Sequence, residues 1–282
     1  MTSPTAEPLS FPRAILFAVA AVICFHAAYS LDRFVAPQLL ILGYPVCLTQ
    51  LARLNSTRQS FYLSLSAAYL CFAPQLVFFW SIFGSPAIVL WLILALWIAL
   101  DVVLTQLTLA RFGVKIAAAL VPFLWMGLEY TRSELYYLKF SWLNISYTRV
   151  TDELIRQGAQ LLVVPTMDVT DWGAQEHMAN ARVAPVRAAE YGVPIFRLAS
   201  SGISQAVDQR GQIISRAAFP GEGETLFAAF RLPAKGALPL DRWLAPFSVI
   251  VVAAVSLIHL FWRWMPRRVV DRRRAATVMR TV

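Results

Sequence analysis

Residues 86–109, PAIVLWLILALWIALDVVLTQLTL, contain a single charged side chain, Asp101. A helix needs roughly 20 apolar residues to cross the bilayer core, so this stretch predicts a membrane span. The composition agrees, because 58% of the 282 residues are hydrophobic and only 15% are charged. Such a chain is neither a wholly soluble protein nor a disordered one. With only three cysteines, it is not a disulfide-stapled secreted module either.

Other apolar stretches extend this pattern to six predicted spans. Working outward from 86–109, they cover residues 14–31, 34–52, 62–83, 114–131 and 244–264. The stretch at 34–52 is the weakest, since Pro37, Gly43 and Pro45 interrupt it. Five spans therefore precede residue 131, and one follows the polar region.

Basic residues in short loops predict the orientation of the spans. Arg53 and Arg58 follow the second span, and Arg111 and Lys115 follow the fourth, so both loops are expected on the cytoplasmic side. Five spans then deliver residues 132–243 to the outer side. The sixth span returns the C-terminal tail to the cytoplasm.

The net charge of +9 is concentrated in that tail. Residues 244–282 hold seven basic side chains and one acidic one, whereas residues 132–243 hold twelve and eleven. A basic segment directly after a span is typical of contact with anionic lipid. Nucleic acid is the rival partner, but no aromatic residues interleave the arginines, so we expect none.

Between the last two spans the pattern changes to that of a small α/β domain of about 80 residues, which is little for an independent core. A helix is expected to end at Gly158, and a second helix to cover 173–191 and stop at Gly192, kinked or split at Pro185. The run AQLLVVP at 159–165 is typical of a strand buried on both faces. Further strands are expected at 194–199, 203–208, 212–216 and 225–232, with a turn at 208–211 between the second and third of these.

The run at 157–213, QGAQLLVVPTMDVTDWGAQEHMANARVAPVRAAEYGVPIFRLASSGISQAVDQRGQI, carries a family resemblance. It is similar to the second half of the carbon-nitrogen hydrolase (nitrilase) domain as it occurs in bacterial apolipoprotein N-acyltransferases. The matching pieces, in order, are Gly158 to Leu162, Asp171-Trp172, His177, Arg187 to Glu190, Pro194 with Arg197, Ser201 to Ser204, Asp208 and Gly211. The membrane half resembles the same family at Pro122, Trp125, Glu129, Arg132, Phe140 to Leu143 and Tyr147.

The resemblance implies a periplasmic αββα sandwich on an inner-membrane helical bundle. It also implies transfer of an acyl chain from phospholipid to the N-terminus of a lipoprotein. In the family a glutamate acts as base, a lysine stabilises the oxyanion and a cysteine carries the acyl chain as a thioester. Such roles suit acyl transfer, because a thiolate needs a base and the tetrahedral intermediate needs a positive donor.

The first half of the hydrolase domain, which supplies these catalytic residues in the family, has no counterpart here. Only a few residues separate Tyr147 from the second-half match. The only cysteines, Cys24, Cys47 and Cys71, fall inside the first three predicted spans. We therefore expect no Glu-Lys-Cys triad and no acyl transfer by this chain alone.

A second alignment places Ser146 at the cysteine position of the family. Ser146 would then be the nucleophile, with Glu134 or Glu153 as its base and Lys139 at the oxyanion. Serine is far less nucleophilic than cysteine without a well-placed base. The competing interpretation makes Ser146 a loop residue after the fifth span.

Three other groups of polar residues invite a functional interpretation. Asp168, Asp171 and His177 offer two carboxylates and an imidazole, but their spacing is not that of a zinc motif, so we expect no metal and no other cofactor. Arg187 and Glu190 are expected to form a local ion pair. Asp101 and Glu129 are functional candidates because acids are costly inside a membrane, and Asp101 could serve an ion path or pair with Arg111.

The sequence thus predicts an α-helical membrane bundle plus a shortened α/β nitrilase-like domain of the αββα sandwich type. The expected function is that of a degenerate N-acyltransferase in lipoprotein biosynthesis. A membrane-anchored scaffold, and an acyltransferase or amide hydrolase with a different nucleophile or a partner chain, are the alternatives. The expected partners are phospholipid, a lipoprotein, and a second copy or partner chain covering the apolar sheet surface that a half sandwich leaves exposed. The predicted segments are 1–131 (five spans), 132–150 (outer membrane-proximal), 151–236 (partial hydrolase domain), 244–264 (C-terminal span) and 265–282 (basic tail).

Overall fold

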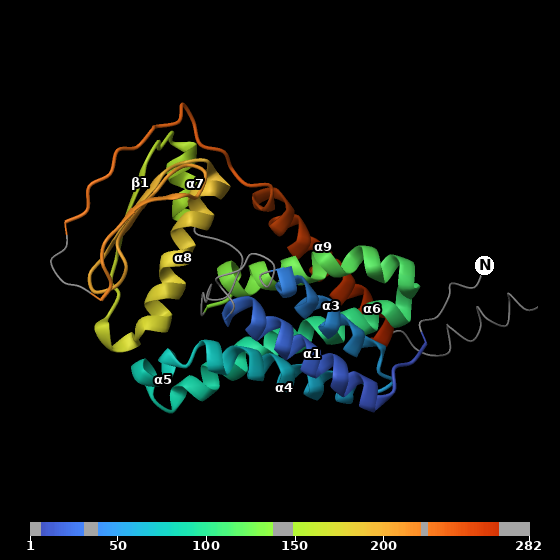
Figure 1. Cartoon of the computed structure of the whole chain (residues 1–282). Helices are drawn as coiled ribbons and strands as arrows, with labels where there is room; N and C mark the ends of the chain where they lie inside the picture. The colour runs from blue at the N-terminus through green and yellow to red at the C-terminus, as the bar shows by residue number, and fades with distance from the viewer. Residues whose placement is uncertain (1–6, 31–38, 138–148, 221–224, 265–282) are drawn as a thin grey trace, which may run out of the picture. The chain divides into compact units, whose positions relative to one another are not determined.

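A computed structural model describes residues 7–30, 39–137, 149–220 and 225–264 (Figure 1). The chain divides into two compact units. The first holds residues 1–71, 94–140 and 245–282, and the second holds 72–93 and 141–244. The first unit is helical, and the second contains the sheet.

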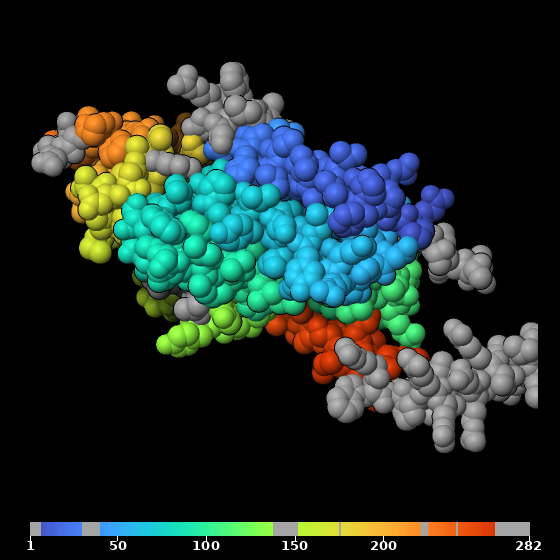
Figure 2. All heavy atoms as spheres, turned by 90° about the horizontal axis from the view of Figure 1, so that it is seen from below, coloured from blue at the N-terminus to red at the C-terminus, as the bar shows by residue number. Residues whose placement is uncertain are grey.

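The helices of the first unit pack through aromatic and small residues. Helix α1 (Phe11–Ser30) lies against α3 (Gly43–Gln50), with the ring of Phe25 on that of Tyr44. It also meets α4 (Thr57–Gln75), because His26 Nε2 lies 3.0 Å from the carbonyl oxygen of Leu70. Figure 2 shows these helices, blue to cyan, forming one continuous surface.

Helix α6 (Pro86–Tyr130) contains a sharp reversal at Gly113, whose φ of 77° favours glycine. The ring centroids of Trp97 and Tyr136 are 5.4 Å apart, whereas a straight helix would separate them by about 58 Å at 1.5 Å per residue. The α6 segment is therefore a hairpin of two helices. Its two arms correspond to the predicted spans 86–109 and 114–131.

Within the described part of the chain, three helices are long and apolar enough to cross a membrane, namely Phe11–Tyr29, Pro86–Leu135 and Arg242–Trp262. The second includes both arms of the α6 hairpin and the π-helical turn η3 (Thr131–Leu135). The predicted spans 34–52 and 62–83 are not among the three. In the described part of residues 34–52, the short helices η1 (Leu39–Leu42), α3 and η2 (Leu51–Arg53) follow one another. Residues 62–83 are divided between α4 and α5 (Phe78–Phe83).

Close packing holds α9 (Asp241–Trp264) against the second arm of the α6 hairpin. A Cβ on Gly127 would lie 2.5 Å from the carbonyl oxygen of Ser248, so only glycine permits this approach. Phe123 meets Phe247 at the same level, and the guanidinium of Arg111 lies 3.6 Å from the Trp262 ring centroid. The red surface of α9 accordingly borders the green surface of α6 in Figure 2.

The second unit is built on a four-stranded mixed sheet in the order β1-β2-β3-β4. Strands β1 (Leu162–Thr166) and β2 (Ile195–Ala199) are parallel and are joined through helix α8 (Ala174–Tyr191). Strands β3 (Gln205–Val207) and β4 (Ile213–Arg216) extend the sheet in antiparallel fashion. These elements match the predicted ones closely, and Gly192 ends α8 in the left-handed conformation with φ of 64°.

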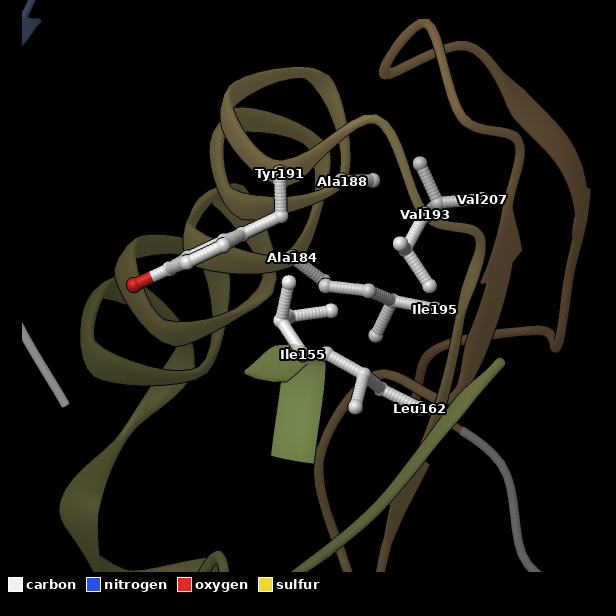
Figure 3. Packing of buried hydrophobic residues seen from close by; sticks show 8 residues of the cluster. All are labelled: Ile155, Leu162, Ala184, Ala188, Tyr191, Val193, Ile195 and Val207. Atoms are coloured by element: carbon white, nitrogen blue, oxygen red, sulfur yellow. The ribbon is translucent and has the colours of Figure 1, made fainter. Parts of the chain in front are cut away.

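The core of the second unit lies between the sheet, α8 and α7 (Arg149–Arg156) (Figure 3). Its buried residues are Ile155, Leu162, Ala184, Ala188, Tyr191, Val193, Ile195 and Val207. Alanines on the inner face of α8 let the helix approach the strands. Pro185 is accommodated inside α8, so the helix is not split there.

Two strand predictions were wrong. Residues 225–232 form no strand; instead the following segment bonds to other elements, with Ala237 N–H donating to the carbonyl of Tyr191. Strand β1 is not buried on both faces, because Val163 is 55% exposed. Leu198 and Ile214 are also exposed, at 40% and 46%. The sheet is covered by α8 on one face and leaves apolar side chains open on the other.

Candidate functional site

Three buried polar side chains gather beyond the carboxyl end of β1. Asp168 follows that strand, and Glu176 and His177 lie in the first turn of α8. His177 Nδ1 is 3.3 Å from Glu176 Oε2 and 3.8 Å from Asp168 Oδ2. Each of the three residues is 2% exposed or less. Burying two carboxylates beside an imidazole is costly unless other groups balance their charge.

Neighbouring residues hold two sides of this cluster. Arg197 on β2 donates to Asp168 Oδ2 at 2.6 Å and also donates to the carbonyl of Ile203. Asn180, one turn along α8, donates to Asp168 Oδ1 at 3.3 Å and to Glu176 Oε1. The Arg197 guanidinium offsets the negative charge of Asp168. The Asn180 amide fixes Oδ1 of Asp168 and Oε1 of Glu176.

Two facing atoms of the cluster remain outside this network. Glu176 Oε2 and His177 Nδ1 make no hydrogen bond within the part of the chain that the structure describes. Burial, followed by the charge of Asp168, raises the pKa of Glu176 to about 7. The arrangement can hold a proton or a cation between Glu176 and His177.

Close backbone approach explains a glycine beside the cluster. A Cβ on Gly202 would overlap the Oδ2 atom of Asp168. Ser200 tightens the same loop, since its hydroxyl accepts from Asp168 N–H at 3.1 Å and lies at the same distance from the Asp168 carbonyl. The Ser-Gly turn after β2 therefore sets the position of the Asp168 carboxylate.

The cluster differs from the group considered in the sequence. Asp168 and His177 are together, but Asp171 is exposed in the short helix η4 (Thr170–Trp172) and is not part of the cluster. Glu176 takes its place and was missed. Its position directly before His177 gave no signal, because adjacent helical residues are not expected to share a face.

The candidate catalytic residues are only partly described. Ser146 and Lys139 lie outside the described residues. Glu153 is exposed on α7, where it accepts a hydrogen bond from Gln157 Nε2. Glu134 lies in η3, at the end of the α6 hairpin. The structure therefore leaves the Ser146 hypothesis a prediction.

All three cysteines lie on helices of the first unit. Cys24 is on α1, Cys47 is on α3, and Cys71 is buried on α4. The sequence has no further cysteine, so the α/β unit carries no thiol.

Inside the membrane helices, Asp101 is buried, and its carboxylate oxygens make no hydrogen bond to any residue that the structure describes. It does not pair with Arg111, which instead stacks on Trp262. Glu129 lies 3.8 Å from Arg132, three residues along the chain. Asp101 thus remains a candidate for an intramembrane role.

Two ion pairs of the second unit are structural. Arg187 and Glu190 form the expected pair on α8, with Nη1 and Oε2 2.5 Å apart. A second and more buried pair joins Arg242, in the first turn of α9, to Asp152 on α7 at 2.8 Å. Tyr191 donates to the same carboxylate and accepts from Arg242, and burial raises the pKa of this tyrosine.

A comparison with known protein families finds one relationship. Residues 21–169 match the model of the apolipoprotein N-acyltransferase N-terminal domain. The match covers more than half of the chain, including the α6 hairpin and the start of the α/β unit. No curated protein and no solved structure matches the chain.

Proposed function

The chain belongs to the apolipoprotein N-acyltransferase family, and on that premise we propose that it is a membrane protein of lipoprotein acylation that binds the family's substrates without forming an acyl thioester. Its substrates would be a phospholipid and a lipoprotein that carries acyl chains. Both molecules have an apolar part and a polar part. Such substrates suit a protein that combines membrane helices with a polar unit.

The position of the cysteines carries this proposal. A thioester mechanism needs a thiolate with a base nearby and a positive donor for the oxyanion. Cys24, Cys47 and Cys71 all lie on helices of the first unit, namely α1, α3 and α4. The α/β unit, which resembles half of a nitrilase-like sandwich, offers the reaction no sulfur.

The one-sided sheet supports the idea of a shortened sandwich. An αββα domain packs two sheets face to face, so each sheet is covered on both sides. Here α8 covers one face, and Val163 and Leu198 are exposed on the other. The expected location of this unit is the periplasmic side of a bacterial inner membrane, with the basic tail in the cytoplasm.

Binding and transfer can be measured in one preparation. The full chain is placed in lipid nanodiscs and mixed with a fluorescent diacylated lipopeptide or with the same peptide lacking acyl chains. Fluorescence anisotropy reports binding, and mass spectrometry reports N-acylated product. An intact family enzyme is the positive control for transfer.

We expect the diacylated peptide to bind and the peptide without acyl chains not to bind. We also expect no N-acylated product to form. Failure of the lipopeptide to bind would contradict the substrate-binding role. Product formation would contradict the non-catalytic role, and its loss in Ser146→Ala would identify a serine nucleophile.

A further inference from the structure

We propose that Asp168, Glu176 and His177 bind a zinc-sized divalent metal ion that fastens the loop after β1 to the start of α8. The site lies wholly within the α/β unit, and it is independent of the substrate binding proposed above. It revises the expectation that the chain holds no metal.

The spacing of the three side chains suits such an ion. Zinc binds imidazole nitrogen and carboxylate oxygen at about 2.0–2.2 Å, and tetrahedral ligands at that distance lie about 3.3–3.6 Å apart. His177 Nδ1 is 3.3 Å from Glu176 Oε2 and 3.8 Å from Asp168 Oδ2. One ligand atom from each residue lies within 4.8 Å of the others. Small side-chain rotations would bring all three to bonding distance.

The unpartnered atoms point to a ligand rather than to a closed polar network. Within the cluster, Glu176 Oε2 and His177 Nδ1 make no hydrogen bond to any residue that the structure describes, and the two atoms lie 3.3 Å apart. Buried polar atoms are rarely left unpaired in this way. A metal ion would use both atoms at once.

The surrounding residues act as a metal's outer shell does, by fixing the orientation of the ligands. Asn180 holds Asp168 Oδ1 and Glu176 Oε1, which leaves Glu176 Oε2 for the ion, while Asp168 Oδ2 would be shared between the ion and Arg197. Arg197 bonds to Asp168 Oδ2 and lowers the net negative charge of the cluster. We therefore expect affinity in the micromolar range rather than the nanomolar range.

Stability is the physical benefit of this site. An α/β unit of about 80 residues has a small core, and metal binding to such a unit contributes directly to folding. The ligands come from the loop after β1 and from α8, so the ion would add a second crosslink to the hydrogen bond from Asn180 to Asp168. Carboxylate and imidazole ligands suit Zn²⁺, with Co²⁺ as its spectroscopic substitute.

The test uses the purified full chain in detergent after treatment with a chelator. Zn²⁺ is titrated by calorimetry and Co²⁺ by visible absorption, and melting temperature is recorded with each. Glu176→Gln is the main variant, because glutamine keeps the shape of the side chain and its carbonyl still accepts from Asn180. Asp171→Asn is the matched control, since this carboxylate is nearby but exposed.

We expect one Zn²⁺ per chain and a rise in melting temperature on the order of 10 °C at a hundredfold excess over Kd. Glu176→Gln should weaken binding at least tenfold, and Asp171→Asn should not change it. The Co²⁺ spectrum of the unmodified chain should show d–d bands without a thiolate charge-transfer band. That spectrum supplies a test even if a variant fails to fold.

Three results would overturn the proposal. They are absence of stoichiometric binding by the folded chain, equal affinity in Glu176→Gln and the unmodified chain, and a thiolate charge-transfer band that assigns the ion to a cysteine. None of these results bears on lipopeptide binding, so the two proposals fail separately.

Discussion

Arg242 at the start of α9 and Asp152 on α7 form a buried ion pair, with 2.8 Å between Nε and Oδ1. Their side chains are 2% and 6% exposed, and Tyr191 bonds to both. Both residues belong to the second unit, so the pair ties the N-terminal turn of α9 to α7 within that unit.

Removing Asp152 should destabilise the α/β unit strongly. Asp152→Ala would leave the Arg242 guanidinium buried without this partner, and breaking a buried pair costs about 3–5 kcal/mol. Arg187→Ala is the control, since its partly exposed pair is worth about 0–1 kcal/mol. Unfolding by denaturant in detergent measures both losses. Equal losses would refute a special role for the Arg242–Asp152 pair.

Gly127→Ala should separate α9 from the α6 hairpin. The new methyl group would lie 2.5 Å from the Ser248 carbonyl oxygen and 2.7 Å from Val252 Cγ2, and such overpacking costs about 1–3 kcal/mol. Val252→Ala in the same chain should recover part of the loss. Melting temperature in detergent reports the effect. An unchanged melting temperature in Gly127→Ala would show that the two helices are not in close contact.

Neighbouring substitutions on β2 test whether only one face of the sheet is covered. Ile195→Ala removes a core side chain and should cost about 2–5 kcal/mol. Leu198→Ala changes the open face and should cost less than about 1 kcal/mol. Chemical unfolding at several protein concentrations compares them. A large, concentration-dependent loss in Leu198→Ala would mean that a second copy covers this face in solution.

The proposed topology places the α/β unit and the basic tail on opposite sides of the membrane. In a chain whose three cysteines are replaced by serine, a single cysteine is introduced by Arg210→Cys or Arg280→Cys. A membrane-impermeant thiol reagent applied to spheroplasts should label the first variant and spare the second until the membrane is broken. Labelling of both or of neither before lysis would contradict the topology.

The sequence predicted the elements whose local signals are strong. The two arms of α6, the end of α8 at Gly192 and the strands at 195–199, 205–207 and 213–216 follow from apolar runs bounded by glycine or a turn. Residues 225–232 have the composition of a strand, but strand formation also needs a partner edge, which sequence does not reveal. Their neighbour Pro233 instead accepts a hydrogen bond from Gln160 Nε2.

The polar cluster was harder to predict because its geometry depends on tertiary contacts. Asp168 lies just after β1, and Arg197 lies within β2. The parallel pairing of β1 with β2 brings the two side chains together. Glu176 joins them only because the first turn of α8 points toward the sheet edge. The sequence analysis identified Asp168 and His177, but it grouped them with Asp171, which is exposed, and not with Glu176.

Intact-protein mass spectrometry tests the central claim most directly. The full chain is incubated with phospholipid, alongside an intact family enzyme, and each mass is recorded before and after hydroxylamine. We predict that the family enzyme gains one acyl chain that hydroxylamine removes, whereas this chain gains none. An acyl adduct on this chain that neutral hydroxylamine removes would contradict the account, because neutral hydroxylamine cleaves thioesters but not a serine ester, so Cys24, Cys47 or Cys71 would form the thioester that their positions are predicted to prevent.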